Sequence, residues 1–499
     1  MNPSHGAGGT FTALQRHLLP LLLVPAFVSL LAVSSVNVIL PAVSRSVETS
    51  TSGLALIVSG YSLVFGVLLV PAGRAGDVMG RGRLFVVGLL LFGLGSLATG
   101  LAPTIVVLNA SRLLMGVGAG LFNPQVTGLI QQFYAAEARG RAFGLFGGVI
   151  GVSVAVGPVL SGGLIAALGA DWGWRASFLI NVPFALAGAW AARRHLPPGA
   201  WRRVNELTGR AGASGPAGQG DPGPREAAGG GRADFDPVGM SLLALATVAV
   251  MAPFMEYARG AWVWSLLVLG VIVTGIWVAW ERRYRERGRQ PMVDLSLLRV
   301  PSFAFGCLAI AIYFLGYTSV WIIVAQYLQT GLGKSALASG LMGVPAALCA
   351  AVLAAVSGRR VMRVGRAMVL WGMILGIVGL GSTVLVVHLR AAVGLSPWWM
   401  AATLSLLGVG QGLVVSPNQT LSLVDVPLEY AGAAGGILQT GERIGTAIGI
   451  AAFTGIAFRV AEGSGWDTAA QVALGAIAGV ILVSAAVALA DLCVAARRR

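Results

Sequence analysis

Residues 73–81 have the sequence Gly-Arg-Ala-Gly-Asp-Val-Met-Gly-Arg, and residues 358–366 have the sequence Gly-Arg-Arg-Val-Met-Arg-Val-Gly-Arg. The two segments share a frame of Gly, six residues and Gly-Arg, and they lie 285 residues apart. A second pair, Gly-Val-Gly-Ala-Gly-Leu at 116–121 and Gly-Val-Gly-Gln-Gly-Leu at 408–413, repeats at an offset of 292. The chain therefore contains two related halves in the same order.

The composition around these repeats is that of a membrane protein. Of 499 residues, 56% are hydrophobic and 11% are charged, and the mean hydropathy is +0.81. Soluble domains carry about 25% charged residues. The composition therefore excludes a soluble enzyme, a disordered chain and a nucleic-acid binder with an exposed basic face, and it predicts an all-α membrane protein with many spans.

Apolar stretches long enough to cross a bilayer follow one another along the chain. A transmembrane helix needs about 20 mainly apolar residues. The sequence predicts fourteen such helices, at 18–41, 54–72, 84–102, 104–130, 141–168, 175–192, 237–255, 262–280, 302–328, 336–356, 367–387, 397–419, 431–458 and 470–494.

The internal repeat divides these spans into two matching sets. Spans one to six correspond to spans nine to fourteen, and spans seven and eight remain as an inserted hairpin. The predicted units are a six-helix bundle at 1–192, a flexible linker at 193–236, the hairpin at 237–280, a basic connector at 281–301 and a second six-helix bundle at 302–499. Half-repeats in the same orientation are typical of transporters, with the substrate site at the repeat interface.

The basic residues predict the orientation of the chain in the membrane. With the N-terminus in the cytoplasm, 26 of the 34 Lys and Arg residues lie in cytoplasmic segments and 6 lie in outer loops. This bias is the one that orients membrane proteins. We therefore expect both termini in the cytoplasm of a bacterial cell, with the chain crossing the plasma membrane many times.

Three motifs resemble those of the major facilitator superfamily. Residues 73–83 resemble its signature loop between spans two and three, and residues 109–120 (Asn-Ala-Ser-Arg-Leu-Leu-Met-Gly-Val-Gly-Ala-Gly) resemble its fourth-span motif. Residues 147–163 are similar to the fifth-span motif of its antiporters. Fourteen spans resemble the drug:proton antiporter branch, the multidrug-resistance-type exporters. The resemblance implies the major facilitator fold and alternating access around a central cavity.

The loop after the second span carries candidate gating residues, Gly73, Asp77, Gly80 and Arg81. We expect the Asp77 carboxylate to act as an electrostatic latch against a helix N-terminus or a neighbouring arginine. The second repeat has Met362 in the place of Asp77, so we expect the latch on one side only. The alternative is that these charges serve topology alone.

Arg112 lies inside the fourth span. A guanidinium there costs at least ~2.5–3.5 kcal/mol, so its side chain must face the bundle interior and find acceptors. The resemblance implies a role in proton coupling for this arginine. The alternative is a structural residue held by backbone carbonyls and hydroxyl groups such as that of Ser111.

Glu442 and Arg443 lie near the middle of the thirteenth span. Adjacent helix residues point about 100° apart, so the two side chains cannot serve the same partner well. Burial favours the protonated form of a carboxyl group, which makes Glu442 the candidate coupling carboxylate. Arg443 matches an arginine common in the resembled branch. The alternative for Glu442 is a local pair with Arg112, Arg443 or a hydroxyl group.

The fifth span is rich in glycine, and its candidate residues are Gly147, Gly151, Gly157, Pro158 and Gly162. Proline removes a backbone hydrogen bond and is expected to kink the helix. A glycine face permits close contact with the opposite half, which would close a gate. The alternative is ordinary small-residue helix packing.

Polar residues inside other spans either line the cavity or bond between helices, and both possibilities stay open. These residues are Asn37, Asn123, Gln125, Asn418 and Gln419. The sequence contains no metal-ligand spacing, no phosphate-binding loop and no catalytic set. We therefore expect no enzyme activity and no cofactor, with a proton gradient as the energy source.

One departure from the resembled branch affects the substrate. Ala32 stands where that branch usually has an aspartate, five residues before Asn37, so neutral or anionic amphiphiles are as suitable as cationic drugs. The sequence predicts a monomer that exports hydrophobic or amphiphilic, drug-like molecules against protons. The alternatives are a narrow exporter of an endogenous metabolite or lipid, and a membrane sensor that does not transport.

Overall fold

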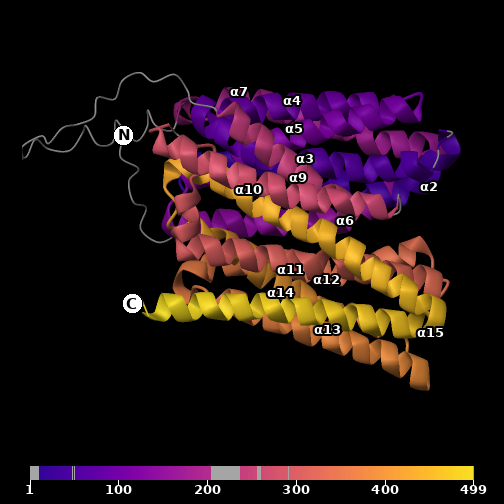
Figure 1. Ribbon diagram of the computed structural model, residues 1–499. Coiled ribbons are helices and arrows are strands. Elements are labelled where there is room, and N and C mark those ends of the chain that lie inside the picture. Colours follow the sequence, from indigo (N-terminus) through magenta and orange to yellow (C-terminus); the bar gives the residue numbers. More distant parts are fainter. Residues whose placement is uncertain are drawn as a thin grey trace, which may run out of the picture.

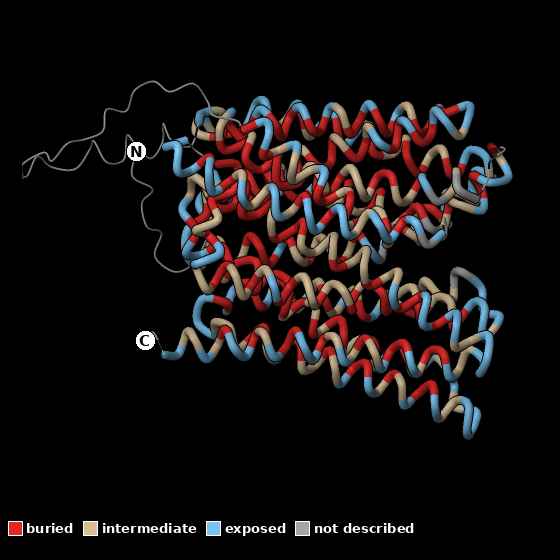
Figure 2. The backbone as a smooth tube through the Cα atoms, viewed as in Figure 1, coloured by how far each residue is buried: buried red, intermediate tan, exposed pale blue. Residues whose placement is uncertain are grey.

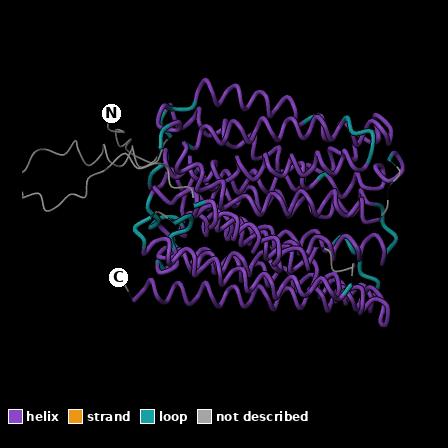
Figure 3. The backbone as a smooth tube through the Cα atoms, turned by 45° about the horizontal axis from the view of Figure 1, so that its top comes forward, coloured by secondary structure: helices purple, strands orange, loops and turns teal. Residues whose placement is uncertain are grey.

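The computed structural model describes residues 11–47, 49, 51–203, 236–255, 260–289 and 291–497. Over these ranges the chain is helical and contains no strand. The helices run between two ends of the molecule, where the loops gather (Figure 3). The beginning of the first helix and the end of the last one lie at the same end (Figure 1), which we call the termini end, and the other is the far end.

The helices before residue 204 pack chiefly on one another and are called the N-terminal group. They are α1 (Ala13–Ser34), α2 (Val36–Ser46), α3 (Thr51–Met79), α4 (Arg81–Gly100), α5 (Ile105–Phe133), α6 (Ala136–Leu179), α7 (Asn181–His195) and the short helix η1 (Pro198–Trp201). Thr12 starts α1 with a capping box, because its hydroxyl accepts from the Gln15 amide while the Gln15 side chain accepts from the Thr12 amide.

The helices after residue 300 form the C-terminal group. They are α11 (Pro301–Gln326), the π-helical turn η5 (Tyr327–Gly331), α12 (Ala336–Val364), α13 (Ala367–Val393), α14 (Trp399–Ser422), η6 (Leu428–Tyr430) and α15 (Ala431–Arg497). The two groups meet along two seams, where α3 packs on α15 and α6 packs on α12.

A further pair of helices lies between the two groups in sequence. It consists of α9 (Pro237–Met255) and α10 (Ser265–Glu286), joined by a segment that contains η3 (Ala261–Trp264), and it is followed by η4 (Leu295–Arg299). Helix α9 packs on α10 and also touches both α3 and α15. The pair therefore lies alongside the α3–α15 seam (Figure 1).

Two long helices are broken at equivalent places. Gly169 in α6 has φ 80 and ψ 172, and Gly465 in α15 has φ 78 and ψ 170. Glycine adopts such positive φ values without the strain that a Cβ would cause. An aspartate follows each break after two residues. Asp171 accepts a hydrogen bond from Ser46 at the end of α2, and Asp467 accepts one from Tyr327 at the end of α11.

The described helices include twelve that are long and apolar enough to cross a membrane. Buried residues lie chiefly inside the bundle and exposed ones chiefly on its outside (Figure 2). The exposed residues include large apolar ones such as Trp190, Val271 and Trp371. Such faces suit a bilayer. The all-helical prediction is confirmed.

Several helices extend beyond their predicted ends toward the termini end. Helix α10 continues to Glu286, and α12 continues to Val364. Helix α6 departs from helical backbone angles at Gly169, directly after the predicted end of the fifth span at residue 168, whereas Pro158 inside that span keeps helical angles. Part of the predicted linker, residues 204–235, lies outside the described residues, whereas the segment around η1 packs against the loop after α3.

Candidate functional site

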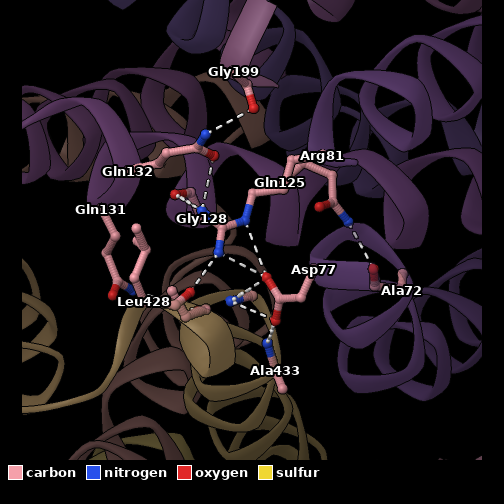
Figure 4. Close-up of polar contacts among 12 residues, drawn as sticks. Ala72, Asp77, Arg81, Gln125, Gly128, Gln131, Gln132, Gly199, Leu428 and Ala433 are labelled. Atoms are coloured by element: carbon pink, nitrogen blue, oxygen red, sulfur yellow. Dashed lines mark hydrogen bonds and ion pairs between the residues drawn. The ribbon is translucent and has the colours of Figure 1, made fainter. Parts of the chain in front are cut away.

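Asp77 joins the two helix groups at the termini end. It lies on the last turn of α3, and its carboxylate accepts hydrogen bonds from the backbone amides of Gly432 and Ala433 at the start of α15, each at 3.2 Å (Figure 4). The N-terminus of a helix presents unpaired amides and a partial positive charge, so it stabilises a carboxylate. The side chain is buried. This contact has the geometry expected of a latch.

Arg81, at the start of α4, uses all five of its N–H groups. It donates to Asp77 at 2.7 and 3.0 Å, to the Gly128 carbonyl at 2.7 Å, to Gln132 at 3.1 Å and to the Leu428 carbonyl at 2.9 Å. The bonds reach α3, α5 and the segment before α15 (Figure 4). A buried guanidinium with every donor paired fixes the angle at which these elements meet.

Glycines allow the backbones to approach closely around this latch. A Cβ at Gly73 would collide with the Gly432 carbonyl, and one at Gly436 would lie 2.6 Å from the Leu69 carbonyl. Gly80 has φ 98, and a Cβ there would lie 2.5 Å from the Trp201 carbonyl. The glycines of the predicted gating loop are thus required by close contacts and by backbone conformation.

The matching loop of the second repeat makes different contacts. Arg366 forms an ion pair with Asp491 on α15, within its own group, at 2.8 Å. Met362 is exposed. The ion pair between the groups at this seam joins exposed Arg363 to Glu137 at the start of α6, at 3.6 Å. No helix N-terminus receives a buried carboxylate from the residues described in this loop.

At this second seam, three glycines of α6 face the backbone of α12. A Cβ at Gly140 or Gly144 would lie 2.6 Å from the carbonyls of Gly358 or Ala354, and one at Gly148 would lie 3.1 Å from the Ala351 carbonyl.

Of the five residues predicted for the fifth span, the first two face the opposite group. Gly147 meets Ser416 and Ala354, and Gly151 meets Ala347. Gly157 packs on Ser34 within its own group, and Gly162 has Val38 as its neighbour at 3.9 Å. The expected glycine face therefore covers only the end of α6 near the termini.

The two intramembrane arginines, Arg112 and Arg443, each lie over an aromatic ring of α3. The Arg112 guanidinium carbon lies 4.3 Å from the centre of the Tyr61 ring, and that of Arg443 lies 4.5 Å from the Phe65 ring. Tyr61 and Phe65 are one turn apart on α3, with ring centres 5.9 Å apart. Arg112 also donates to the Ile57 carbonyl at 3.1 Å. Aromatic faces stabilise cations where water is excluded.

Glu442, the neighbour of Arg443, lies near α11. It interacts electrostatically with Cys307 of α11, and Gly441 beside it packs on Ala311 of the same helix. Neighbours on the helix thus face different partners, as the angular spacing predicts. No ion pair or hydrogen bond joins Glu442 to another described residue, so the alternative of a local pair with Arg112 is not what this conformation contains.

The polar residues proposed for the cavity are buried in helix contacts. Asn123 donates to the Ser29 hydroxyl and the Ala119 carbonyl, Gln125 donates to the Ala72 carbonyl, and Asn418 donates to the Gly306 carbonyl. Gln419 is buried as well. In this conformation these side chains bond within and between helices instead of lining an open cavity. The side chain of Asn37 lies outside the described part of the chain.

The seams are closed toward one end. The hydrogen bonds and ion pairs found between described residues of the two groups lie between the termini end and the level of Gly66, whose carbonyl accepts from Thr440 at 3.4 Å. Toward the far end, a Cβ at Gly163 would have no neighbour within 4 Å. The groups are therefore tied at the termini end.

A sequence profile described as Major Facilitator Superfamily matches residues 22–450. The chain belongs to this superfamily. Its family and fold are those of membrane transporters, and its relatives include drug-resistance and export proteins. The superfamily resemblance of the three sequence motifs is confirmed.

Three relatives illustrate this part of the superfamily. The chain is 32% identical over 426 residues to the probable actinorhodin transporter of Streptomyces coelicolor, covering 83% of this chain and 68% of the relative. It is 29% identical to the multidrug resistance protein Stp of Mycobacterium tuberculosis, covering 83% and 71%. It is 30% identical to the puromycin resistance protein pur8 of Streptomyces alboniger, covering 83% and 76%.

Solved structures of superfamily transporters share the fold. The human organic anion transporter MFSD10 (TETRAN) gives a TM-score of 0.65 at 15% identity, covering 95% of this chain and 99% of that one. The proton:xylose symporter XylE gives 0.64 at 13% identity, with 94% of each chain covered. At these identities the likeness concerns the fold alone.

Sequence reasoning missed several residues that complete the site. Tyr61 and Phe65 hold the two arginines, and an aromatic pair spaced by four residues inside a span was the available signal. Gln132 and the Leu428 carbonyl complete the partners of Arg81. These two carried no sequence signal, because their role depends on how helices from distant parts of the chain meet.

Proposed function

We propose that this superfamily transporter exports hydrophobic or amphiphilic small molecules in exchange for protons, by alternating access. The observation that carries the proposal is the Asp77 latch, a buried carboxylate of one group on a helix N-terminus of the other. A contact of this kind can form at one end of a transporter while the opposite end is open. The names of the relatives support export of drug-like compounds.

The proposed architecture is two six-helix bundles, at 1–192 and 302–499, with an inserted hairpin at 237–280. Counting the helices on either side of Gly169 and Gly465 as separate crossings supports fourteen spans. The excess of basic residues in the loops at the termini end supports cytoplasmic termini in a bacterial plasma membrane. In this orientation the conformation described is closed to the cytoplasm.

Proton coupling is assigned to Glu442, with Arg112 and Arg443 as partners in other steps of the cycle. Glu442 forms no ion pair or hydrogen bond with another described residue, and its electrostatic interaction with the adjacent Arg443 offsets only part of the cost of burying its charge, so a proton that neutralises it is favoured. In this conformation the Arg443 guanidinium lies over the Phe65 ring. We propose that proton release lets Glu442 exchange this environment for a cationic one as the groups move. The proton gradient then drives transport without a cofactor.

The substrate class follows from what the first span lacks. Ala32 is buried and has no charge to attract a cation. We therefore propose neutral or anionic amphiphiles as substrates equally with cationic drugs. A panel of such compounds, including single metabolites and lipids, determines whether the exporter is broad or narrow.

The test is transport by the full chain in proteoliposomes with an imposed pH gradient. We expect substrate and proton to move in opposite directions, and Glu442→Gln to lower gradient-driven flux at least tenfold. Glu462→Gln, an exposed carboxylate on the same helix, is the matched control and should leave flux unchanged. Flux that ignores the gradient would indicate a facilitator, and binding without flux would indicate a sensor.

A further inference from the structure

Two buried carboxyl groups meet at the base of the α9–α10 pair. Asp236 precedes α9, and Glu281 lies near the end of α10, and both are at most 1% exposed. A Cβ at Gly239 would collide with Asp236 Oδ2 and lie 2.9 Å from Glu281 Oε1, so the two carboxyl groups converge on one spot. Oδ2 of Asp236 and Oε2 of Glu281 have no hydrogen-bond partner.

The other oxygen of each group is held by an indole. Trp280 Nε1 donates to Asp236 at 2.8 Å, and Trp277 Nε1 donates to Glu281 at 2.9 Å. The Gly239 amide also donates to Asp236 at 3.0 Å. Both side chains are therefore fixed in place, and the Glu281 oxygen that lies near Asp236 Oδ2 is Oε1, the one held by Trp277.

Arg282, Arg283 and Arg287 of α10 and Arg299 are exposed, and other cations on the surrounding elements have partners of their own. Arg285 of α10 binds Asp294 at 2.8 Å, and Arg289 lies over the Tyr284 ring. On α3, Arg74 interacts with Asp77 and Tyr430, and on α15, Arg443 interacts with Glu442.

The electrostatic partner of Glu281 is Asp236, a group of the same sign. Two adjacent carboxylates that have no counter-ion among the described residues cannot both stay ionised in a buried place.

Glu281 also holds the segment that follows α10. The backbone amides of Met292 and Val293 interact electrostatically with its carboxyl group. Their side chains pack in one apolar cluster with Val70 of α3 and Ile437 of α15. The carboxyl pair is thus placed to anchor residues 291–300 across the α3–α15 seam. These residues, the second half of the predicted basic connector at 281–301, are the segment meant by the connector in the proposal.

We propose that Asp236 and Glu281 bind one proton between them, and that this shared proton clamps the connector over the α3–α15 seam. A single proton on the pair leaves one negative charge in place of two adjacent ones. When the proton leaves, the two negative charges repel each other and the connector detaches. This assigns a proton-binding site and a role to the α9–α10 pair, separate from Glu442.

The sign of the pH dependence follows from linkage. Carboxyl groups in water release their protons near pH 4. Above that pH the Asp236–Glu281 pair therefore holds one more proton when the connector is attached than when it is detached and the pair is hydrated. Attachment is complete at low pH and weakens as pH rises. One proton corresponds to a tenfold change in the equilibrium per pH unit.

The test is hydrogen–deuterium exchange of residues 292–300 in the full chain in lipid nanodiscs between pH 5 and 8, corrected for intrinsic exchange. We expect protection of these amides to fall about tenfold per pH unit. Glu281→Gln and Asp236→Asn should each keep protection and remove this slope. Glu286→Gln, an exposed carboxylate on the same helix, should keep the slope.

A charge-neutral variant covers the case in which the acid variants do not fold. Trp277→Phe removes a donor that favours ionised Glu281, so the proton is held more tightly and the slope should continue to higher pH. A flat wild-type profile would overturn the proposal, as would loss of protection at every pH in both acid variants. A slope that moves with sodium or potassium concentration would overturn it in favour of a metal cation. Exchange requires no transport, so it tests the clamp independently of the transport direction.

Discussion

The two glycine–arginine loops have the same frame and opposite uses. In the first repeat, Asp77 and Arg81 are buried and join the N-terminal group to the start of α15. In the second repeat, Arg366 turns to Asp491 in its own group, and the seam relies on glycine contacts and the exposed pair Arg363–Glu137. One seam is therefore fixed by buried charge and the other by backbone packing, so the seams should differ in sensitivity to substitution.

Removing the charge of the first loop should have the largest effect. Asp77→Ala leaves the Arg81 guanidinium buried without its carboxylate, which costs about 3–5 kcal/mol. We expect the seams to open at the termini end. The distance between spin labels on exposed Arg83→Cys and Val424→Cys, with the native cysteines replaced, measures this opening. Met362→Ala, at the matching position, should leave the distance unchanged. An unaltered distance in Asp77→Ala would show that the latch does not hold the closed state.

Exchanging arginine for lysine compares the two loops directly. Lysine has three donors on a single nitrogen and cannot make the five bonds of Arg81. Arg81→Lys loses hydrogen bonds to a charged group. This loss should shift the equilibrium between the closed and the open termini end toward opening by roughly 2–3 kcal/mol. Arg366→Lys should shift it by at most about 1 kcal/mol, because one ion pair can re-form. The same label pair reports both, and equal shifts would contradict the distinction.

A methyl group on α6 probes the packed seam. The Gly144→Ala side chain would lie 2.6 Å from the Ala354 carbonyl, and such overpacking costs about 1–3 kcal/mol. We expect partial opening of the α6–α12 seam, measured between labels on the ends of these helices. Gly163→Ala on the same helix meets no atom within 4 Å and serves as the control. If Gly144→Ala and Gly163→Ala give the same label distance across the α6–α12 seam, close packing at this seam does not contribute to closure.

The smallest effect is expected for the exposed pair at the second seam. Glu137→Gln removes an ion pair with an N–O distance of 3.6 Å, and exposed pairs contribute 0–1 kcal/mol. Transport and label distances should stay near those of the wild type, and added salt should make no further difference. A loss comparable to that of Asp77→Ala would show that charge governs both seams.

Local patterns in the sequence were sufficient for the helices and for the partner of Asp77. The apolar stretches marked the spans, and the repeated frame marked the two groups. A carboxylate at the end of a span has few partners other than a helix N-terminus or an arginine, and here it has both. The fifth span was predicted to end at residue 168, and α6 is broken at the next residue, Gly169, whose φ does not continue a helix, whereas Pro158 keeps helical backbone angles.

Contacts between distant helices could not be predicted. Burial of Gln125 and Asn418 depends on how α3, α5, α11 and α14 pack, which the sequence of each helix leaves open. The same holds for Tyr61 and Phe65, whose rings meet arginines from two other helices. Asp236 and Glu281 were 45 residues apart in sequence and gave no spacing signal.

The breaks at Gly169 and Gly465 bear on the origin of the molecule. Their backbone angles agree within 2°, yet the residues around them differ apart from the aspartate that follows. Each aspartate accepts a hydrogen bond from a hydroxyl group at the end of the first membrane-crossing segment of its group, which is Ser46 in one and Tyr327 in the other. A gene duplication explains this agreement, because both copies inherit the same bend and the same anchor. In the proposed architecture the α9–α10 pair is an insertion between the two copies, which would make it an acquisition separate from the duplication.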